Sequence, residues 1–130
     1  GHRRTPELAA RFADEFNAPF HVPADADRQF RRVREACSEI GRDPGSLRYS
    51  VAAVICCGVD DAELSRRAAA IGRDVDELRR NGACGKPASV AARLEEWAAV
   101  GADTVYLQFL DLSDLDHIRL VAREVAPALS

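Results

Sequence analysis

The sequence predicts an α/β protein in which parallel strands alternate with connecting helices. Two apolar runs, residues 47–57 and 104–110, have the length of buried strands. The first run is almost unbroken, which is typical of a parallel strand covered on both faces. The segments between the strands carry apolar residues at helical spacing, so we expect right-handed crossovers between parallel strands.

The chain begins with a predicted helix followed by a short strand. Thr5 offers a hydroxyl cap and Pro6 suits the first helical position, so a helix is expected to about Ala13. Residues 15–18 then predict a brief strand, which Pro19 stops.

A longer helix is predicted over residues 25–40, and Gly41 ends it. Its apolar stripe consists of Phe30, Val33, Cys37 and Ile40. Residues 47–57 form the clearest strand, and both of its faces are expected to be buried.

Two helices of unequal length are expected directly after this strand. Asp60 or Asp61 caps the first, which runs to about Ile71, and Asp74 caps a small helix that ends near Arg80. A third helix opens at residues 85–87 and ends at Gly101. Residues 104–110 then predict a second buried strand.

The last helix is predicted from the residues that follow this strand. Residues 111–114 supply its caps. Its expected apolar stripe consists of Leu115, Ile118, Val121 and Val125. Three strands are therefore visible in the sequence.

Composition limits the possible classes of protein. The chain has 130 residues, 30% of them charged, and a net charge of −3, which fits a single globular domain over residues 1–130. Nucleic acid is not an expected partner because no basic face is evident, and no apolar run is long enough for a transmembrane helix. The spacing of the four cysteines predicts reduced thiols in a cytoplasmic protein, with no disulfide framework and no metal site.

Two observations predict that this fold is incomplete by itself. The chain contains no methionine, which leads us to expect a segment of something longer. Three βα units are too few to close a (β/α)₈ barrel and would leave unpaired sheet edges. We therefore expect a homodimer, or association with the missing part of a barrel.

Two motifs carry a resemblance to a known family. Residues 3–17 read RRTPELAARFADEFN, and residues 85–94 begin GKPASV and end in RL, before GADTVYLQ at residues 101–108. Both segments resemble motifs of the luciferase-like monooxygenase superfamily, and they occur in the order found there. The family usually has Thr or Ser where this chain has Lys86.

The resemblance implies a particular fold and chemistry. The family consists of F420- or flavin-dependent oxidoreductases with a (β/α)₈ barrel, and the matched motifs belong to the C-terminal part of that barrel. Coenzyme F420 or FMN is the implied cofactor, with a small-molecule substrate. The missing part would supply much of the active site, so the chain alone is expected to be inactive.

The start of the chain is the candidate cofactor site. A helix N-terminus binds anions, and in the family this region lies near the cofactor phosphate. The candidate residues are Gly1, His2, Arg3, Arg4 and Thr5. Solvated arginines beside an ordinary helix cap remain the alternative.

Candidate substrate contacts come from residues near the carboxyl ends of strands, where barrel enzymes place their chemistry. Asn17, His21 and Gln108 are the candidates; turn or capping roles are the alternative for Asn17 and Gln108, and His21 is a candidate acid or hydrogen-bond donor to the substrate. Cys57 and Asp111 occupy similar positions, Lys86 at a helix start is a candidate phosphate contact or an ordinary surface lysine, and His117 is expected to be solvated.

Two functions of different class fit these observations. The first is a C-terminal portion of a luciferase-like oxidoreductase that contributes cofactor and substrate contacts. The second is a non-catalytic truncated barrel that oligomerises or binds a phosphorylated ligand. A bound yellow cofactor would distinguish the first from the second.

Overall fold

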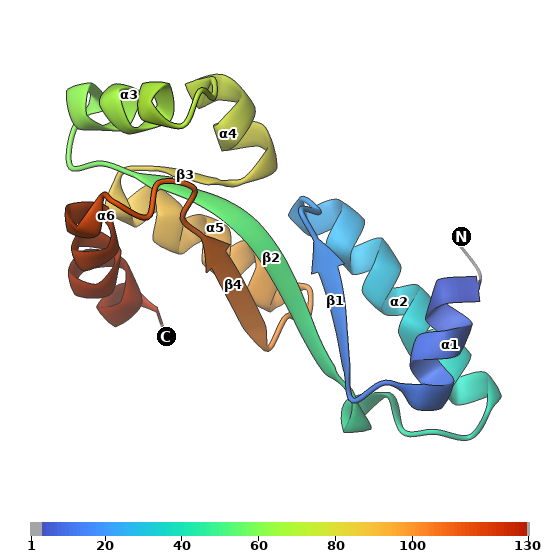
Figure 1. Cartoon of the computed structure of the whole chain (residues 1–130). Coiled ribbons are helices and arrows are strands. Elements are labelled where there is room, and N and C mark those ends of the chain that lie inside the picture. Colours follow the sequence, from blue (N-terminus) through green and yellow to red (C-terminus); the bar gives the residue numbers. More distant parts are fainter. Residues whose placement is uncertain (1–3, 130) are drawn as a thin grey trace. The chain divides into compact units, whose positions relative to one another are not determined.

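The computed structural model describes residues 4–129, which form two compact units (Figure 1). The first unit holds residues up to Ala52 together with Trp97–Tyr106, and the second holds Ala53–Glu96 together with the residues from Leu107 onward. The prediction of a single domain stays a prediction.

The described residues contain six α-helices and four strands. In chain order these are α1 (Arg4–Phe12), β1 (Glu15–Pro19), α2 (Pro23–Glu39), β2 (Arg48–Cys57), α3 (Asp61–Ala70), α4 (Val75–Asn81), β3 (Ala83–Gly85), α5 (Pro87–Ala99), β4 (Thr104–Gln108) and α6 (Leu115–Leu120). Short helical turns are η1 (Pro44–Ser46), the π-helical η2 (Val121–Val125) and η3 (Ala126–Ala128).

The strands pair around β2, as the long apolar run predicts. β1 lies parallel to the first half of β2, with Glu15 opposite Arg48 and Pro19 opposite Ala52. β3 lies parallel to its last three residues, and β4 also pairs with β2. The expectation that the two long apolar runs form neighbouring strands is confirmed. The short strand β3 was not predicted, because a strand of three residues that ends in Gly85 carries no visible alternation.

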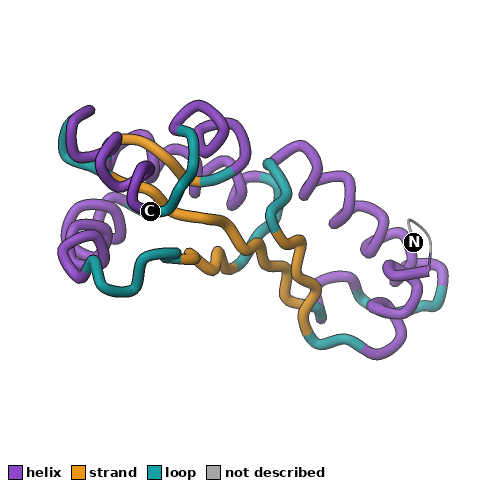
Figure 2. The backbone as a smooth tube through the Cα atoms, turned by 45° about the horizontal axis from the view of Figure 1, so that its top comes forward, coloured by secondary structure: helices purple, strands orange, loops and turns teal. Residues whose placement is uncertain are grey.

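In the first unit, α2 covers β1 and the first half of β2. Phe30 is fully buried, and its ring meets Phe16 of β1 and Tyr49 of β2 edge to face. Figures 1 and 2 show α1 lying against α2. The predicted helix over residues 25–40 is confirmed, with Gly41 at φ +74° just beyond its end.

The predicted cap of the first helix is wrong. α1 already includes Arg4, so Thr5 lies inside the helix and does not cap it. The strand that follows ends at Pro19, as predicted.

In the second unit, α3 and α4 cover one face of the last part of β2, as Figure 1 shows. The apolar cluster beneath them consists of Val54, Cys56, Leu64, Ala68, Leu78 and Cys84. Both predicted caps are present: Asp60 Oδ1 accepts the Glu63 N–H at 2.8 Å, and Asp74 Oδ2 accepts the Glu77 N–H at 3.1 Å. All four cysteines are buried free thiols.

Predictions about apolar burial are wrong at three places, the first of which is Ile40, an exposed residue just after α2. β4 was expected to be buried, yet Thr104, Tyr106 and Gln108 are exposed, because its side chains alternate between a partly covered face and a free one. In the last helix, Leu115 and Ile118 are exposed. The buried residues there are His117, Leu120, Val121 and Val125.

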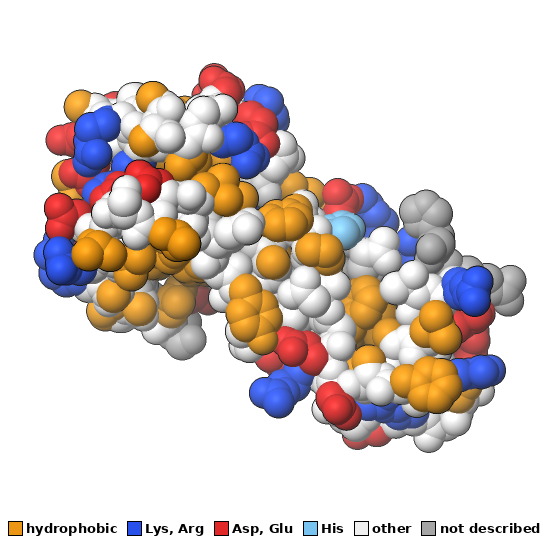
Figure 3. All heavy atoms as spheres, in the orientation of Figure 1, with side chains coloured by type: hydrophobic (Ala, Val, Ile, Leu, Met, Phe, Trp, Pro, Cys, Tyr) orange, Lys and Arg blue, Asp and Glu red, His pale blue; other side chains and the backbone are white. Residues whose placement is uncertain are grey.

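Large hydrophobic side chains are exposed in both units, and Figure 3 shows such side chains on one face. In the first unit they include Leu8, Phe12 and Phe20; in the second, Leu110 and Leu112. None of the helices within residues 4–129 combines the length and the apolar character that a membrane crossing requires.

Candidate functional site

An open pocket of about 490 Å³ lies beside β1 in the first unit. Its lining residues are Thr5, Phe16, Asn17, Ala18, Pro19, His21 and Gln29. They come from the start of α1, from β1 and the turn after it, and from α2. The pocket thus brings together Thr5, predicted to contact a cofactor, and Asn17 and His21, predicted to contact a substrate.

Asn17 is held in place by the neighbouring strand. It is the register partner of Ser50 on β2, and its side-chain Nδ2 donates a hydrogen bond to Ser50 Oγ at 3.0 Å. Ser50 is fully buried, so this contact fixes the amide from the inside of the unit. The amide oxygen of Asn17 is then the polar atom that remains for a ligand.

His21 is positioned by a tight turn after β1. Pro19 ends the strand, and Phe20 adopts a left-handed backbone with φ +56°, which is rare for a bulky residue and marks a conformation imposed by its surroundings. The N–H of Phe20 donates to Ala52 O at 2.8 Å. This turn places His21 at the pocket.

Both the ring and the backbone of His21 are fixed by hydrogen bonds. Its Nδ1 lies 2.7 Å from Pro19 O, and because a carbonyl only accepts, Nδ1 carries the proton. Nε1 of the fully buried Trp97 donates to His21 O at 2.9 Å. Nε2 is therefore the ring nitrogen that can accept a hydrogen bond from a ligand.

The other predicted site residues lie elsewhere or outside the described chain. Gly1, His2 and Arg3 fall outside residues 4–129. Arg4 is exposed in the first turn of α1, one residue before Thr5. Gln108 is the exposed last residue of β4 and does not line the pocket, and Lys86 is an exposed residue before α5.

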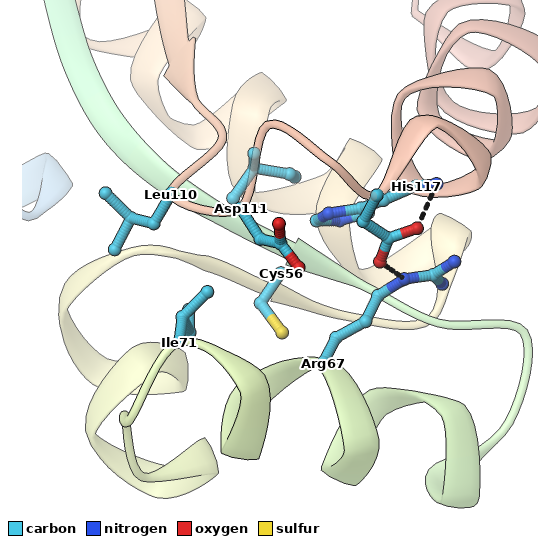
Figure 4. Close-up of a pocket in the computed structure, with 8 residues that line it drawn as sticks. Cys56, Arg67, Ile71, Leu110, Asp111 and His117 are labelled. Atoms are coloured by element: carbon cyan, nitrogen blue, oxygen red, sulfur yellow. Dashed lines mark hydrogen bonds and ion pairs between the residues drawn. The ribbon is translucent and has the colours of Figure 1, made fainter.

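A second cluster of polar side chains lies inside the second unit, at the end of β2 (Figure 4). Arg67 of α3 is only 5% exposed. Its Nε donates to Asp114 Oδ2 at 2.9 Å, its Nη1 donates to Cys57 O at 2.9 Å, and it also pairs with Glu63. These contacts join α3, the end of β2 and the start of α6.

His117 completes this cluster, and the prediction that it is solvated is wrong. It is 6% exposed, and its Nε2 accepts the backbone N–H of Cys57 at 2.9 Å. The backbone N–H of His117 donates to Asp114 Oδ1 at 3.1 Å, so the predicted cap of the last helix is confirmed. This cap sets the helix so that His117, and not Leu115, faces β2.

Burial and charge explain the proton affinities in this cluster. Burial and the nearby Arg67 lower the pKa of His117, which keeps the ring neutral and able to accept from Cys57. The hydrogen bond from Arg67 lowers the pKa of Asp114. Burial raises the pKa of the Cys57 thiol to about 11, so it is not an activated nucleophile.

The cavity beside this cluster is too small for an organic ligand. It has about 10 Å³ of space, roughly that of one water, and Cys56, Arg67, Asp111 and His117 lie in its wall. The cluster thus has the features of a structural network, whereas the pocket of the first unit has the size of a ligand site.

Sequence reasoning missed several of these residues. Arg67 was missed although its position gave a signal, since Leu64, Arg67 and Ala68 form the buried stripe of α3. A cation on an apolar stripe points to a buried ion pair. Gln29 of α2 gave no signal, because its place in the pocket depends on how α2 lies against β1.

The sequence and the fold were compared with those of known proteins. No family model and no curated protein matches the sequence. Solved structures do match. An F420-dependent secondary alcohol dehydrogenase in complex with an F420–acetone adduct matches with a TM-score of 0.79 and 14% identity over 98% of this chain and 46% of that chain.

Two further structures agree with this match. The coenzyme F420-dependent tetrahydromethanopterin reductase from Methanopyrus kandleri has a TM-score of 0.76 and 14% identity, covering 100% of this chain and 49% of that chain. The oxygenating constituent of 3,6-diketocamphane monooxygenase from Pseudomonas putida, in complex with FMN, has a TM-score of 0.69 and 17% identity, covering 100% and 47%.

At these identities the likeness concerns the fold, and the chain spans about half the length of the structures that it matches. The fold class that the two motifs predicted is confirmed. The chain has a parallel α/β fold that matches about half of the chain in structures of F420-dependent and FMN-complexed enzymes.

Proposed function

We propose that the chain is the C-terminal portion of a luciferase-like oxidoreductase that depends on coenzyme F420 or FMN. In this proposal Gly1, His2, Arg3, Arg4 and Thr5 contact the phosphate of the cofactor. Asn17, His21 and Gln108 contact the substrate. The chain acts in the cytoplasm as part of a larger assembly.

One observation carries the proposal: a ligand-sized pocket lies within a fold shared with F420-dependent and FMN-complexed enzymes. Its volume of about 490 Å³ suits part of a ring system. Phe16, Ala18 and Pro19 give it apolar walls, while Asn17, His21 and Gln29 give it hydrogen-bonding groups.

The chemistry divides between cofactor and protein. When bound, the cofactor would supply hydride transfer or reaction with oxygen. The residues of this chain would bind and orient. The positive end of α1 and the Arg4 guanidinium suit a phosphate, because anions are stabilised at helix N-termini. The Asn17 amide is fixed by Ser50 and the His21 ring by Pro19 O, so both side chains can hold a ligand in one orientation.

The proposed assembly is a homodimer or a complex with the missing part of the barrel. The exposed face of β4 and the exposed Leu110 and Leu112 support this proposal, because such side chains are covered where barrel strands are complete. Sedimentation at tens of micromolar tests it. A clean monomer of about 14 kDa would count against self-association.

Cofactor titration tests the function. We expect F420 and FMN to bind the isolated chain with a dissociation constant weaker than about 100 μM, since most cofactor contacts of a barrel come from other strands. At millimolar cofactor, NMR shifts should concentrate at Arg4, Thr5 and the pocket. Arg4→Ala should reduce them, and Arg66→Ala, an exposed residue of the second unit, should not.

Two outcomes would contradict this picture. Binding at micromolar concentration would mean that the chain completes a cofactor site by itself or by assembly. Shifts that avoid the first unit with both cofactors would favour the non-catalytic module.

A further inference from the structure

We propose that Cys56 and Cys84 form a site of reversible oxidation in the second unit, at which a peroxide converts the two thiols into a disulfide. The inference goes beyond the proposed function and does not depend on a bound cofactor. It assigns a chemical modification to two cysteines that the pocket of the first unit does not involve.

The register of the sheet brings the two cysteines together. Cys56 of β2 is the register partner of Cys84 of β3, and both belong to the apolar cluster under α3 and α4, so their side chains lie on the same face. Neighbouring strands lie about 4.8 Å apart, and a disulfide joins residues whose Cα atoms are about 4.4 to 6.8 Å apart. The backbone therefore already has the spacing that a cross-link requires.

The other two cysteines are not aligned in this way. Cys57 points to the opposite face of β2, and its register partner is Gly85, which has no side chain. Cys37 lies on α2 and belongs to the first unit. Of the four cysteines, all in the described part of the chain, Cys56 and Cys84 are thus the pair that strand pairing aligns.

Cys56 is the sulfur that reacts first in this proposal. It lies in the wall of the cavity of about 10 Å³ together with Arg67 and Leu110, and Leu110 is 43% exposed, so the cavity lies close to the surface (Figure 4). The hydrogen bond with the Cys84 thiol lowers the pKa of Cys56, burial opposes this shift, and the Arg67 guanidinium adds to it. A thiol with a lowered pKa beside a second thiol is typical of oxidation-sensitive cysteines.

The reaction takes place in two balanced steps with hydrogen peroxide as the oxidant. The Cys56 thiolate attacks one peroxide oxygen, so an S–O bond forms, the O–O bond breaks, and the leaving hydroxide takes the thiol proton and departs as water. The Cys84 sulfur then attacks the Cys56 sulfur, so an S–S bond forms, the S–O bond breaks, and a second water carries away the Cys84 proton. The two thiols lose two electrons, and the peroxide gains them.

The disulfide would fix a short strand. β3 has three residues, and just beyond its pairing with β2 the N–H of Gly58 donates to Gly85 O at 3.2 Å. A cross-link between Cys56 and Cys84 prevents β3 from separating from β2, and a thiol reductant reverses this effect. We therefore expect the amide hydrogen of Gly58 to exchange more slowly in the oxidised chain than in the reduced chain.

Peptide mapping of the full chain tests the site. The reduced chain is treated with hydrogen peroxide, the remaining thiols are alkylated, and trypsin then separates residues 49–66, which hold Cys56, from residues 81–93, which hold Cys84. We expect a disulfide to join these two peptides, two of the four thiols to be lost, and dithiothreitol to restore them. Oxidised glutathione, which is too large for the cavity, should leave all four thiols free over the same time.

Variants identify the reacting sulfurs. Cys57→Ala changes the neighbouring residue on the opposite face and should retain the cross-linked peptides, whereas Cys56→Ala and Cys84→Ala should lose them. In Cys84→Ala the oxidised Cys56 has lost its register partner thiol, so dimedone should trap it as a sulfenic acid adduct. In Cys56→Ala no such adduct should form on Cys84.

Three results would overturn the inference: four free thiols after peroxide treatment of the native chain, cross-linked peptides that persist in Cys56→Ala, or a disulfide that joins two chains on a denaturing gel. Equal reaction with oxidised glutathione would also contradict it, because the thiols would then react after the unit opens and not through the cavity. The cofactor titration is made with reduced thiols, so failure of one proposal is distinguishable from failure of the other.

Discussion

The two internal histidines show how differently the two units use the same side chain. His117 is 6% exposed, and its Nε2 accepts the backbone N–H of Cys57 within the second unit. His21 is half-buried and fixed through Nδ1, so its Nε2 remains available to accept a hydrogen bond at the pocket. The His117 ring is part of a buried hydrogen-bond network, whereas the His21 ring is only oriented by its hydrogen bond to Pro19 O.

The surroundings of the two rings differ in the same way. Around His117, Arg67 and Asp114 satisfy each other, and the adjacent cavity has space for about one water. Around His21, the pocket of about 490 Å³ has no ion pair in its lining. A buried and fully paired cluster contributes to stability, whereas fixed but unsatisfied groups beside a pocket indicate binding.

Arg67→Ala should have the largest effect. It removes the cation between Glu63 and Asp114 and leaves Cys57 O without its side-chain donor. Removing one partner from a buried ion pair costs about 3–5 kcal/mol, so the free energy of unfolding in urea should fall by that amount. Arg66→Ala, next to it on the exposed face of α3, should change it by less than about 0.5 kcal/mol. Similar values for both variants would show that the cluster does not stabilise the second unit.

His117→Ala should have the next largest effect. It leaves the Cys57 N–H buried without an acceptor and opens a cavity beside Phe109, whose ring centre lies 4.9 Å from that of His117. An unsatisfied buried donor costs about 1–3 kcal/mol, and we expect a loss near the upper end in urea unfolding. His117→Gln, which offers a carbonyl acceptor, should recover part of this loss.

Acid should weaken the cluster through His117. Because its pKa is lower in the folded than in the unfolded chain, the unfolded state binds more protons once the pH falls below the ordinary histidine value of about 6.5. Stability is then full above that pH and declines as the pH falls toward the lowered value. The slope is at most about 1.4 kcal/mol per pH unit for one proton.

Asp114 adds to this loss only below about pH 4, where the unfolded chain begins to protonate its aspartates while the lowered pKa keeps the folded Asp114 ionised. Urea unfolding at several pH values, in the native chain and in His117→Ala, checks the assignment. The slope between pH 6.5 and 5 should be smaller in the variant. An equal slope in both would place the titration elsewhere.

The sequence predicted the elements that local signals control. The run over residues 47–57, the caps at Asp60 and Asp74, and the stop at Pro19 all depend on neighbours along the chain. β3 was missed because three residues give no periodicity. The exposed face of β4 was missed because an apolar run does not reveal which elements cover it.

The candidate site was predicted in part, for a related reason. Asn17 and His21 were found because residues at the carboxyl end of a strand are a general place for ligands. Gln29 was missed, because it reaches the pocket only through the packing of α2. His117 was misjudged because its burial depends on contacts distant in the sequence, with the Cys57 N–H and the Phe109 ring, which helical spacing does not reveal.

His21→Ala should have the smallest effect on stability, within about 0.5 kcal/mol. The ring is half-buried, its one hydrogen bond is local, and Pro19 O can be hydrated when the ring is removed. The backbone contact from Trp97 to His21 O does not involve the side chain and should persist. The same variant should reduce the NMR shifts that millimolar cofactor induces at the pocket, measured in the cofactor titration. A small loss of stability together with a large loss of binding distinguishes His21 from His117. A loss above about 1.5 kcal/mol in urea would mean instead that His21 supports the fold as His117 does, and that its fixed ring is a structural feature of the turn after β1.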